Sequence, residues 1–519
     1  MKKILILSSL WIAIFGLFSC TDDLDTSPVV EKSIENLLAE NPEAIKGIIA
    51  KLYAGLSVHG QGVPGSSDQQ PDVIGDDPGE TVYLRSLFNM QEMTSDIVKN
   101  RWGDNGLDPL TTAQGWAPTN KFFGYMYNRI FFQIAQANNV LLEIEKINVP
   151  EEETFIAEAR FIRALSYYHA MDLFGEVPIV TEADGIGGAA KAQSTRAEVF
   201  NFVEEELLAI ENTIPDDLGY GRVNKATIQM VLAKIYLNAE VYTGSERYSD
   251  ALTYSKKVID DNNFSIDDDY QSIFQADNFT SEEIIFPLVA DKSNIQSFGN
   301  ATYLINGSYS SDTMPLTDFG AEQGWTGHRC TKAIYGLFGD LETTDDSRAI
   351  FWTEGHEFEM EDYRKWTDGY PTTKFRNTRA DGVENLTNFT DTDFPMFRLA
   401  DAYLMYTEAQ LRSSEGSQQL AVDLINELRE RAFGDDSNNI TAADLTLDFI
   451  IDERARELYY EAHRRQDLIR FKRFTGGTYN WPWKGGVASG TSIPSHYNLF
   501  PKPLEAIQAN PNLKQNRGY

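Results

Sequence analysis

Residues 158–175 read EARFIRALSYYHAMDLFG. Ala159, Ile162 and Leu165 recur at helical spacing and form one apolar face, which aromatic residues between them widen. An apolar face of this width is typical of a helix that is buried on most sides. Gly175 marks its end, because glycine commonly follows the last helical residue. The stretch therefore predicts a fold of packed helices.

Helical periodicity dominates three zones, at about residues 31–56, 125–259 and 397–474. In the second zone, the helical stretch that starts at Gly221 is followed, after a short turn, by another that starts at Tyr248. Small alanines alternate with bulky tyrosines in both, as in tetratricopeptide-type helix pairs. Such pairs stack into a curved scaffold. We therefore expect a mainly α fold built on a tetratricopeptide-like scaffold of helix pairs.

The remaining zones break this pattern. Residues 60–120 and 261–394 mix glycine, proline, aspartate and aromatics with little periodicity, and EEIIFPLVA at 282–290 reads as a short strand. The tail at 476–519 is aromatic and rich in turn residues. Long irregular segments in a compact protein are often functional. We expect residues 60–120 and 261–394 to form an irregular, loop-rich lobe that binds the ligand.

The N-terminus has the layout of a secretory signal peptide over residues 1–19: two lysines, then an apolar run too short for a comfortable membrane span. The run ends in LFSC, which fits the lipobox of bacterial lipoproteins, where the cysteine thiol is acylated. We predict a lipidated Cys20 and an acidic anchored tether over 20–30, followed by the folded domain over 31–519. The alternative is an ordinary cleavage site beside a coincidental cysteine.

The amino-acid composition excludes some classes of protein and favours others. The net charge of −33 argues against binding of nucleic acid and against adhesion to anionic lipid. An apolar content of 42% indicates a globular chain. With Cys20 acylated, Cys330 has no partner, so we expect no disulfide in the fold. The pattern favours a globular body held near a membrane by its lipid.

Six blocks of sequence, in order along nearly the whole chain, resemble the SusD/RagB-like lipoproteins, which bind nutrients at the outer membrane beside a TonB-dependent transporter. The blocks are CTDDLD at 20–25, AEARFIRALSYYHAMDLFGEVPIV at 157–180, GRVNKATIQMVLAKIYLNAEVYTG at 221–244, DFPMFRLADAYLMYTEA at 393–409, IIDERARELYYEAHRRQDLIRF at 450–471 and LFPKPLEAIQANPNLKQNRGY at 499–519. The resemblance implies four tetratricopeptide-like helix pairs cradling a variable lobe, without catalytic activity or cofactor. It also implies a lipid-anchored protein, exposed on the outer membrane of Bacteroidetes-type bacteria, with a SusC-like transporter as partner.

Two further stretches, QEMTSDIVKNRWGDNGL and WKGGVASGTSIPSHYN, are similar to the starch-binding branch of that family. That branch grips α-glucan, the polymer of starch and malto-oligosaccharides, with an arc of aromatics and a few polar groups. The resemblance assigns these glycan-binding positions to Asp77, Arg85, Trp102, Asn105, Phe298 and Trp325. There are two departures: Phe298 stands where tyrosine is usual, and Asn100 stands where a second tryptophan is usual.

The chemistry of these residue types suits a sugar. Aromatic rings match the apolar face of a sugar ring, while Arg85 and Asp77 can hold adjacent hydroxyls. Each assignment has an alternative: Asp77 as a turn residue, Arg85 as a structural ion pair, and either tryptophan as a core residue. We expect the other tryptophan pair, Trp481 and Trp483, to pack in the tail.

Other functions remain open. Ligands of another class, a different glycan or a peptide, fit the same family, and a secreted glycoside hydrolase would need a carboxylate pair at a defined separation. The charged stretch DERARELYYEAHRR at 452–465 invites a catalytic interpretation. We interpret it as one scaffold helix, stabilised by pairs at spacing four between Asp452 and Arg456 and between Glu461 and Arg465.

Overall fold

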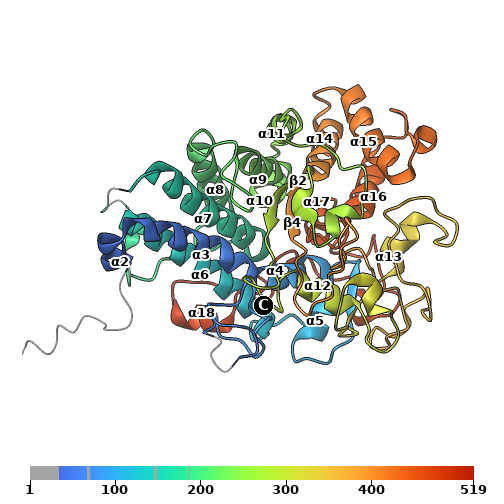
Figure 1. The fold of residues 1–519 in the computed structure, drawn as a ribbon, viewed down its shortest axis with the longest axis horizontal. Helices are drawn as coiled ribbons and strands as arrows, with labels where there is room; N and C mark the ends of the chain where they lie inside the picture. Colours follow the sequence, from blue (N-terminus) through green and yellow to red (C-terminus); the bar gives the residue numbers. More distant parts are fainter. Residues whose placement is uncertain (1–33, 67–69, 145, 147–148, 186) are drawn as a thin grey trace, which may run out of the picture.

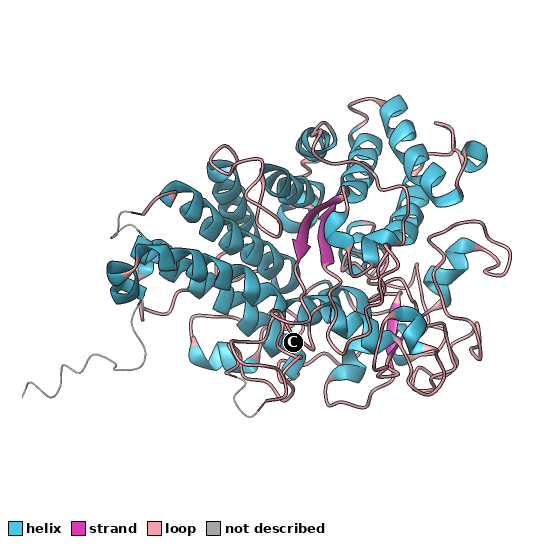
Figure 2. Ribbon diagram, in the orientation of Figure 1, coloured by secondary structure: helices cyan, strands magenta, loops and turns pink. Residues whose placement is uncertain are grey.

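The protein is described by a computed structural model over residues 34–66, 70–144, 146, 149–185 and 187–519. The predicted signal peptide, Cys20 and the tether lie outside the described residues. Helices make up most of the regular structure, with a few short strands (Figure 2). In the described ranges, no helix is both long and apolar enough to cross a membrane.

The helices and strands follow one another in an order that alternates between scaffold and lobe. In the first half of the chain they are α2 (Ile34–Glu40), α3 (Ile45–Ser57), α4 (Tyr83–Phe88), β1 (Val98–Asn100), α5 (Leu107–Thr111), α6 (Lys121–Ile144), α7 (Glu152–Phe174), α8 (Arg196–Ile210), α9 (Lys225–Leu237), α10 (Ala239–Thr243) and α11 (Tyr248–Ile259). In the second half they are β2 (Ile284–Leu288), α12 (Ala301–Ser308), β3 (His328–Cys330), α13 (Lys332–Tyr335), β4 (Phe394–Arg398), α14 (Leu399–Ser413), α15 (Gln418–Phe433), α16 (Leu447–Leu458), α17 (Arg464–Arg470) and α18 (Leu504–Ala509).

The long helices pack as neighbouring pairs, among them α6 with α7, α7 with α8, α9 with α11 and α14 with α15. Figure 1 shows α3, α6, α7 and α8 side by side in one half of the molecule and α14, α15 and α16 in the other. The loop-rich part, which carries α5, α12 and α13, lies beneath the second group. The prediction of a mainly helical scaffold with an irregular lobe is confirmed; its division into segments with separate roles stays a prediction.

The stretch that predicted the fold forms α7, whose residues are all buried from Phe161 to Phe174. The helix ends at Gly175, as predicted, with φ of 75°. A side chain there would be strained by the positive φ, and its Cβ would stand 2.8 Å from Leu499 of the tail. The C-terminal tail therefore packs over the end of this buried helix.

Two antiparallel strand pairs connect distant parts of the chain. The pair β2–β4, which confirms the predicted strand at 282–290, lies between the two helical groups (Figure 2). The pair β1–β3 aligns Val98 with Cys330 and Asn100 with His328. Cys330 is a buried free thiol. Because β1 precedes one predicted aromatic residue and β3 follows another, this pair determines the geometry of the candidate site.

The predicted single helix over the DERARELYYEAHRR stretch is wrong. The chain leaves the helix after Leu458, passes through Tyr460 and Ala462 at positive φ (71° and 64°), and starts α17 at Arg464. The expected spacing-four ion pairs therefore do not stabilise one helix. Positive φ is rare for residues other than glycine, so strong tertiary contacts must hold this turn.

The first expected pair is replaced by a local one, since Arg456 Nε donates to Glu453 at 2.9 Å. The second is replaced by tertiary contacts. Glu461 accepts from Arg398 Nε at 2.7 Å and from Lys374 Nζ at 2.6 Å. Its expected partner, Arg465, donates to backbone carbonyls of the tail instead. Glu461 therefore pairs with buried cations of β4 and the lobe, Arg398 and Lys374, and not with its expected helical partner.

Glu461 belongs to a buried network of charged side chains between the lobe and α14 to α17. Glu457 is its centre: its carboxylate accepts from Arg398 at 2.6 Å, Arg431 at 2.5 Å and Arg348 at 3.1 Å. Both carboxylate oxygens and all three guanidinium groups are buried, so each charge depends on its partners. The network joins the irregular lobe to the helical scaffold.

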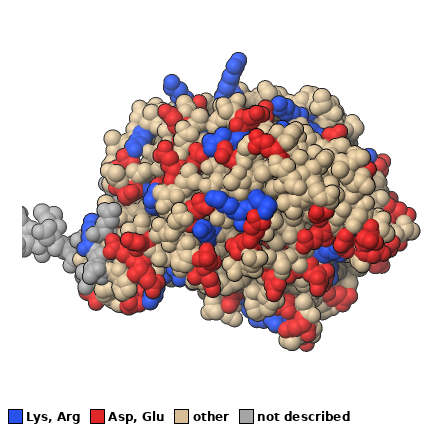
Figure 3. Space-filling view, turned by 90° about the horizontal axis from the view of Figure 1, so that it is seen from above, with Lys and Arg blue, Asp and Glu red and all other residues tan. Residues whose placement is uncertain are grey.

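The surface reflects the acidic composition. Acidic side chains are spread across the face that Figure 3 shows, with basic side chains between them. Within the described residues, no group of three or more His, Cys, Asp or Glu side chains is placed to hold a metal ion.

Candidate functional site

A depression of about 370 Å³ lies where the irregular segments meet. It is lined by Asp77, Arg85, Trp102, Asp104, Phe298, Gln323 and Trp325. The structure thus brings five of the six predicted site residues together, although they are spread over some 250 positions of sequence. The sixth, Asn105, is exposed on the same loop but is not among the lining residues, and its neighbour Asp104 is.

The two tryptophans hold each other in place. Trp102 Nε1 donates to the backbone carbonyl of Trp325 at 2.9 Å, and the ring centroids lie 6.3 Å apart. The amide of Trp102 donates to Asn100 Oδ1 at 2.6 Å. Gly327 leaves room for the Trp102 ring, since a Cβ there would stand 2.4 Å from Trp102 Cε2. The pairing of β1 with β3 therefore builds a fixed aromatic corner.

Phe298 extends the aromatic surface. Its ring meets that of Trp325 nearly edge-on at 6.0 Å and packs on Phe389 at 4.9 Å. Phe298, Trp102 and Trp325 are each partly exposed, in contrast to core aromatics. The three rings therefore present an apolar wall to solvent, of the kind that a sugar ring can contact.

The depression also has charged lining residues. Arg85 in α4 is buried (7% exposed), with its guanidinium 4.4 Å above the Tyr303 ring. Arg85 Nη1 lies 3.4 Å from Asp77 Oδ1, and that oxygen also accepts from the amide of Gly79 at 2.8 Å. Asp77 is therefore a turn residue, and Arg85 is part of an ion pair, as the structural alternatives to a binding role predict. The side chains of Asp77 and Arg85 nevertheless both line the depression.

Sequence reasoning missed three residues of this site. Asp104 and Gln323 line it, and His328 lies behind it, with its ring 5.2 Å from that of Trp102. His328 Nδ1 accepts a hydrogen bond from the side-chain amide of Asn100 at 3.1 Å. Burial, with help from nearby guanidinium groups, lowers the pKa of His328 to about 3, so this imidazole is neutral support for the tryptophan. Asp104 lies inside the stretch QEMTSDIVKNRWGDNGL, and Gln323 is two positions before Trp325. Neither residue belongs to a periodic sequence pattern that would mark it as a site residue.

The tail tryptophans pack as predicted. Trp481 is 1% exposed and contacts the ring of Phe474 at 5.7 Å. Trp483 is partly buried, and its Nε1 donates to the carbonyl of Met360 at 3.0 Å. Neither lines the depression.

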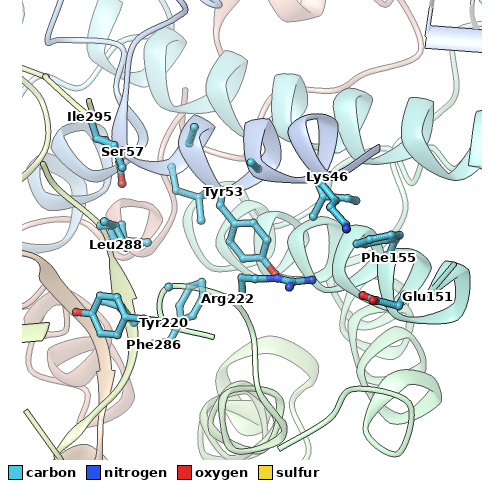
Figure 4. A pocket seen from close by; sticks show the side chains of 17 residues that line it. Lys46, Tyr53, Ser57, Glu151, Phe155, Tyr220, Arg222, Phe286, Leu288 and Ile295 are labelled. Carbon is cyan, nitrogen blue, oxygen red and sulfur yellow. The ribbon is translucent and has the colours of Figure 1, made fainter. Parts of the chain in front are cut away.

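A larger cavity of about 480 Å³ lies between α3, the loop at 220–222 and β2 (Figure 4). Its interior is lined mainly by apolar side chains such as Tyr53, Phe155, Phe286 and Leu288. It contains none of the residues that the sequence indicated, and its Arg222 is already paired with Glu158 at 2.6 Å. A sugar has a rim of hydroxyls that needs polar partners, so the smaller depression fits it better.

Two regions of the chain match models of protein families. Residues 359–519 match the sequence model described as "SusD family". Residues 79–237 match the model described as "Starch-binding associating with outer membrane". The second match includes Arg85, Trp102, Asp104 and Asn105.

Individual proteins and structures give the same result. The chain is 34% identical to "Starch-binding protein SusD" of Bacteroides thetaiotaomicron, with 97% of this chain and 96% of that protein covered. It is 24% identical to "SusD-like protein P25" of Formosa agariphila, with 98% of both covered. Among solved structures, surface glycan-binding protein A of Bacteroides thetaiotaomicron, in complex with laminarihexaose, superposes with a TM-score of 0.70 at 20% identity, covering 91% of this chain and 99% of that one. The chain therefore belongs to the SusD family.

Proposed function

We propose that this protein binds starch and malto-oligosaccharides at the depression lined by Arg85 and the aromatic wall, and delivers them unchanged to a TonB-dependent, SusC-like transporter. The observation that carries the proposal is the convergence of Trp102, Trp325 and Phe298 with the Arg85–Asp77 pair around one depression. The similarity to a starch-binding protein over nearly the full length of both chains supports it.

The geometry explains how such a site would bind an α-glucan. The aromatic wall would contact the apolar faces of the sugar rings, with each contact contributing on the order of 1 kcal/mol beyond burial. The guanidinium of Arg85 and the carboxylate of Asp77 would hold hydroxyls at the rim. We expect a single site of this size to bind weakly, so many copies on one cell would retain a polymer by avidity.

Affinity electrophoresis of the mature, unlipidated protein tests the ligand directly. The gels contain starch, pullulan, dextran or an unrelated β-glucan, and Trp102→Ala and Trp325→Ala run beside the parent. Trp483→Ala is the matched control, since it removes a partly exposed tryptophan outside the depression. We expect retardation by starch and pullulan that the first two substitutions abolish and the third preserves. Retardation by no α-glucan contradicts the starch assignment.

A different glycan is the second candidate, because the similar fold of surface glycan-binding protein A is known in complex with laminarihexaose. Preferential retardation by the β-glucan would support it, and retardation by none of the four polymers would leave another glycan or a peptide as the ligand. We further propose that the protein has no catalytic activity, which the names of its relatives as binding proteins support. New reducing ends released from starch by the pure protein would instead support the hydrolase alternative.

We also propose that the protein is anchored to the outer membrane through lipid on Cys20 and exposed at the cell surface. The match to a family described as associating with the outer membrane supports this location. Labelling with radioactive palmitate should mark the parent but not Cys20→Ser, and protease added to intact cells should digest the anchored protein. For the transporter, crosslinking of native membranes should recover a TonB-dependent protein; recovery of none would contradict the hand-off.

A further inference from the structure

The aromatic wall of the depression has no free hydrogen-bond donor. Trp102 Nε1 donates to the Trp325 carbonyl at 2.9 Å, and Trp325 Nε1 donates to Gln323 Oε1 at 3.3 Å. Phe298 has no polar atom in its side chain. The three rings can therefore offer a ligand only their faces and edges, and the polar contacts must come from the other lining residues.

Those other residues are Arg85, Asp77, Asp104 and Gln323. Gln323 uses its carbonyl oxygen to hold Trp325, which leaves its amide group as a donor toward the depression. The two carboxylates are acceptors only, and they suit hydroxyl donors. The polar side thus combines an amide donor and carboxylate acceptors with one guanidinium.

Among the residues that line the depression, two carboxylates face one guanidinium, so their charge balance is negative. Arg85 is its lining cation, and it is already engaged by Asp77 at 3.4 Å and approached by Glu80 at 4.0 Å. The nearby Lys121 is paired with Asp76 and Glu80, both at 3.0 Å. Asp77 and Asp104 are both exposed, so an incoming anion meets their charges before it reaches the buried guanidinium.

Building on the proposed glycan function, we propose that Asp104 and Gln323 are ligand-contacting residues, and that Asp104 with Asp77 makes this site selective for uncharged glycans. A neutral sugar can donate hydroxyls to both carboxylates and accept from the Gln323 amide. A glycan that carries carboxylate or sulfate groups would bring its charge against Asp77 and Asp104. The net charge of −33 adds a long-range repulsion of the same sign.

Two modified starches test this selectivity. Carboxymethyl starch and hydroxyethyl starch of equal, low substitution carry groups of similar size that differ in charge, so steric effects cancel between them. At low ionic strength, we expect the parent to bind the carboxymethyl form roughly threefold to tenfold more weakly, as like charges at contact distance predict. The difference should shrink in 0.5 M salt, because exposed charges are then screened.

Variants assign the effect to residues. Asp104→Asn should reduce the difference between the two starches, while Asp216→Asn, an exposed carboxylate on a loop of the scaffold, should leave it unchanged. Gln323→Leu, which keeps the size of the side chain but removes its polar atoms, should weaken binding of unmodified starch by roughly threefold to tenfold. Thermal melts of each variant establish that it is folded.

The outcomes separate this inference from the proposed function. If the parent binds no starch at all, the proposed function fails. If it binds starch but treats both modified forms alike at low salt, the selectivity is wrong. If Asp104→Asn keeps the parent's difference, Asp104 is not its source, and unchanged starch binding by Gln323→Leu removes that residue from the contact set.

Discussion

Helix α7 and the turn between α16 and α17 are both largely buried, but different contacts dominate their packing. The apolar face of α7, which includes Ile162 and Leu165, packs in the hydrophobic core as its periodicity predicts, and the buried Glu158 and Arg163 of the same helix are ion-paired. The turn is held by charged side chains: Glu461 is bound by Arg398 and Lys374, and adjacent Glu457 is bound by three arginines. The comparison shows that the burial of apolar residues can be predicted from the local sequence of this chain. The burial of charged residues depends instead on partners that are far away in sequence.

The sharpest way to test this difference is to remove the central carboxylate. Glu457→Ala removes the one carboxylate that Arg348, Arg398 and Arg431 all contact in this buried site, although Arg398 and Arg431 keep Glu283. Breaking a buried ion pair from one side costs about 3–5 kcal/mol of unfolding free energy. Denaturant titration measures this cost. Asp448→Ala on the same helix, whose carboxylate is 88% exposed, should leave the unfolding midpoint unchanged; a similar loss in both would contradict a special role for the network.

The apolar half of the comparison is tested in α7. Leu165 is fully buried, so Leu165→Ala removes methyl groups and leaves a cavity, which should cost roughly 2–5 kcal/mol. The same denaturant titration applies. High salt should not change this loss, because the Leu165 side chain carries no charge, whereas a salt-dependent loss would contradict apolar packing as its source.

Acid should weaken the fold through three buried histidines. Burial lowers the pKa of His169 to about 4 and those of His328 and His463 to about 3, against an ordinary value of 6.5. Below pH 6.5 the unfolded chain takes up protons that the folded chain excludes, so the stability that these groups contribute is lost as pH falls.

Two buried carboxyls oppose this trend. Burial raises the pKa of Glu92 to about 7 and that of Asp393 to about 6, so the folded state gains relative stability from them as pH falls. Because three groups act against two, we expect a net loss on the order of 1 kcal/mol between pH 7 and 5.5. His463→Gln should flatten this dependence in thermal melts, and an unchanged slope would exclude His463 as a contributor.

The fold was largely predictable from the sequence because its helices bury apolar faces at regular spacing. The break after Leu458 was not, since acids and bases at spacing four look the same in a continuous helix as in a broken one. The deciding partners of Glu461 lie 63 and 87 positions away, at Arg398 and Lys374. The local sequence pattern does not indicate contacts over such distances.

The candidate site was predictable only through resemblance to a family, and then only in part. The resemblance supplied residue types, and the structure shows five of them around one depression. It could not supply Gln323 or His328, because their roles depend on the β1–β3 pairing, which places Asn100 beside a residue 228 positions away. Side-chain contacts across such a pairing have no periodic signature.

The smallest expected effect concerns the departure at Phe298. Phe298→Tyr would add a hydroxyl at the rim of the aromatic wall without removing its contacts with Trp325 and Phe389. One added hydrogen bond to a sugar hydroxyl is worth about 0.5–1.5 kcal/mol, so starch should bind roughly twofold to tenfold more tightly in affinity electrophoresis. Phe389→Tyr, on the ring that packs behind Phe298, is the control and should leave affinity unchanged. Equal affinity in the parent and Phe298→Tyr would mean that the sugar contacts only the ring face at this position, which would make the polar side of the depression the sole source of hydrogen bonds.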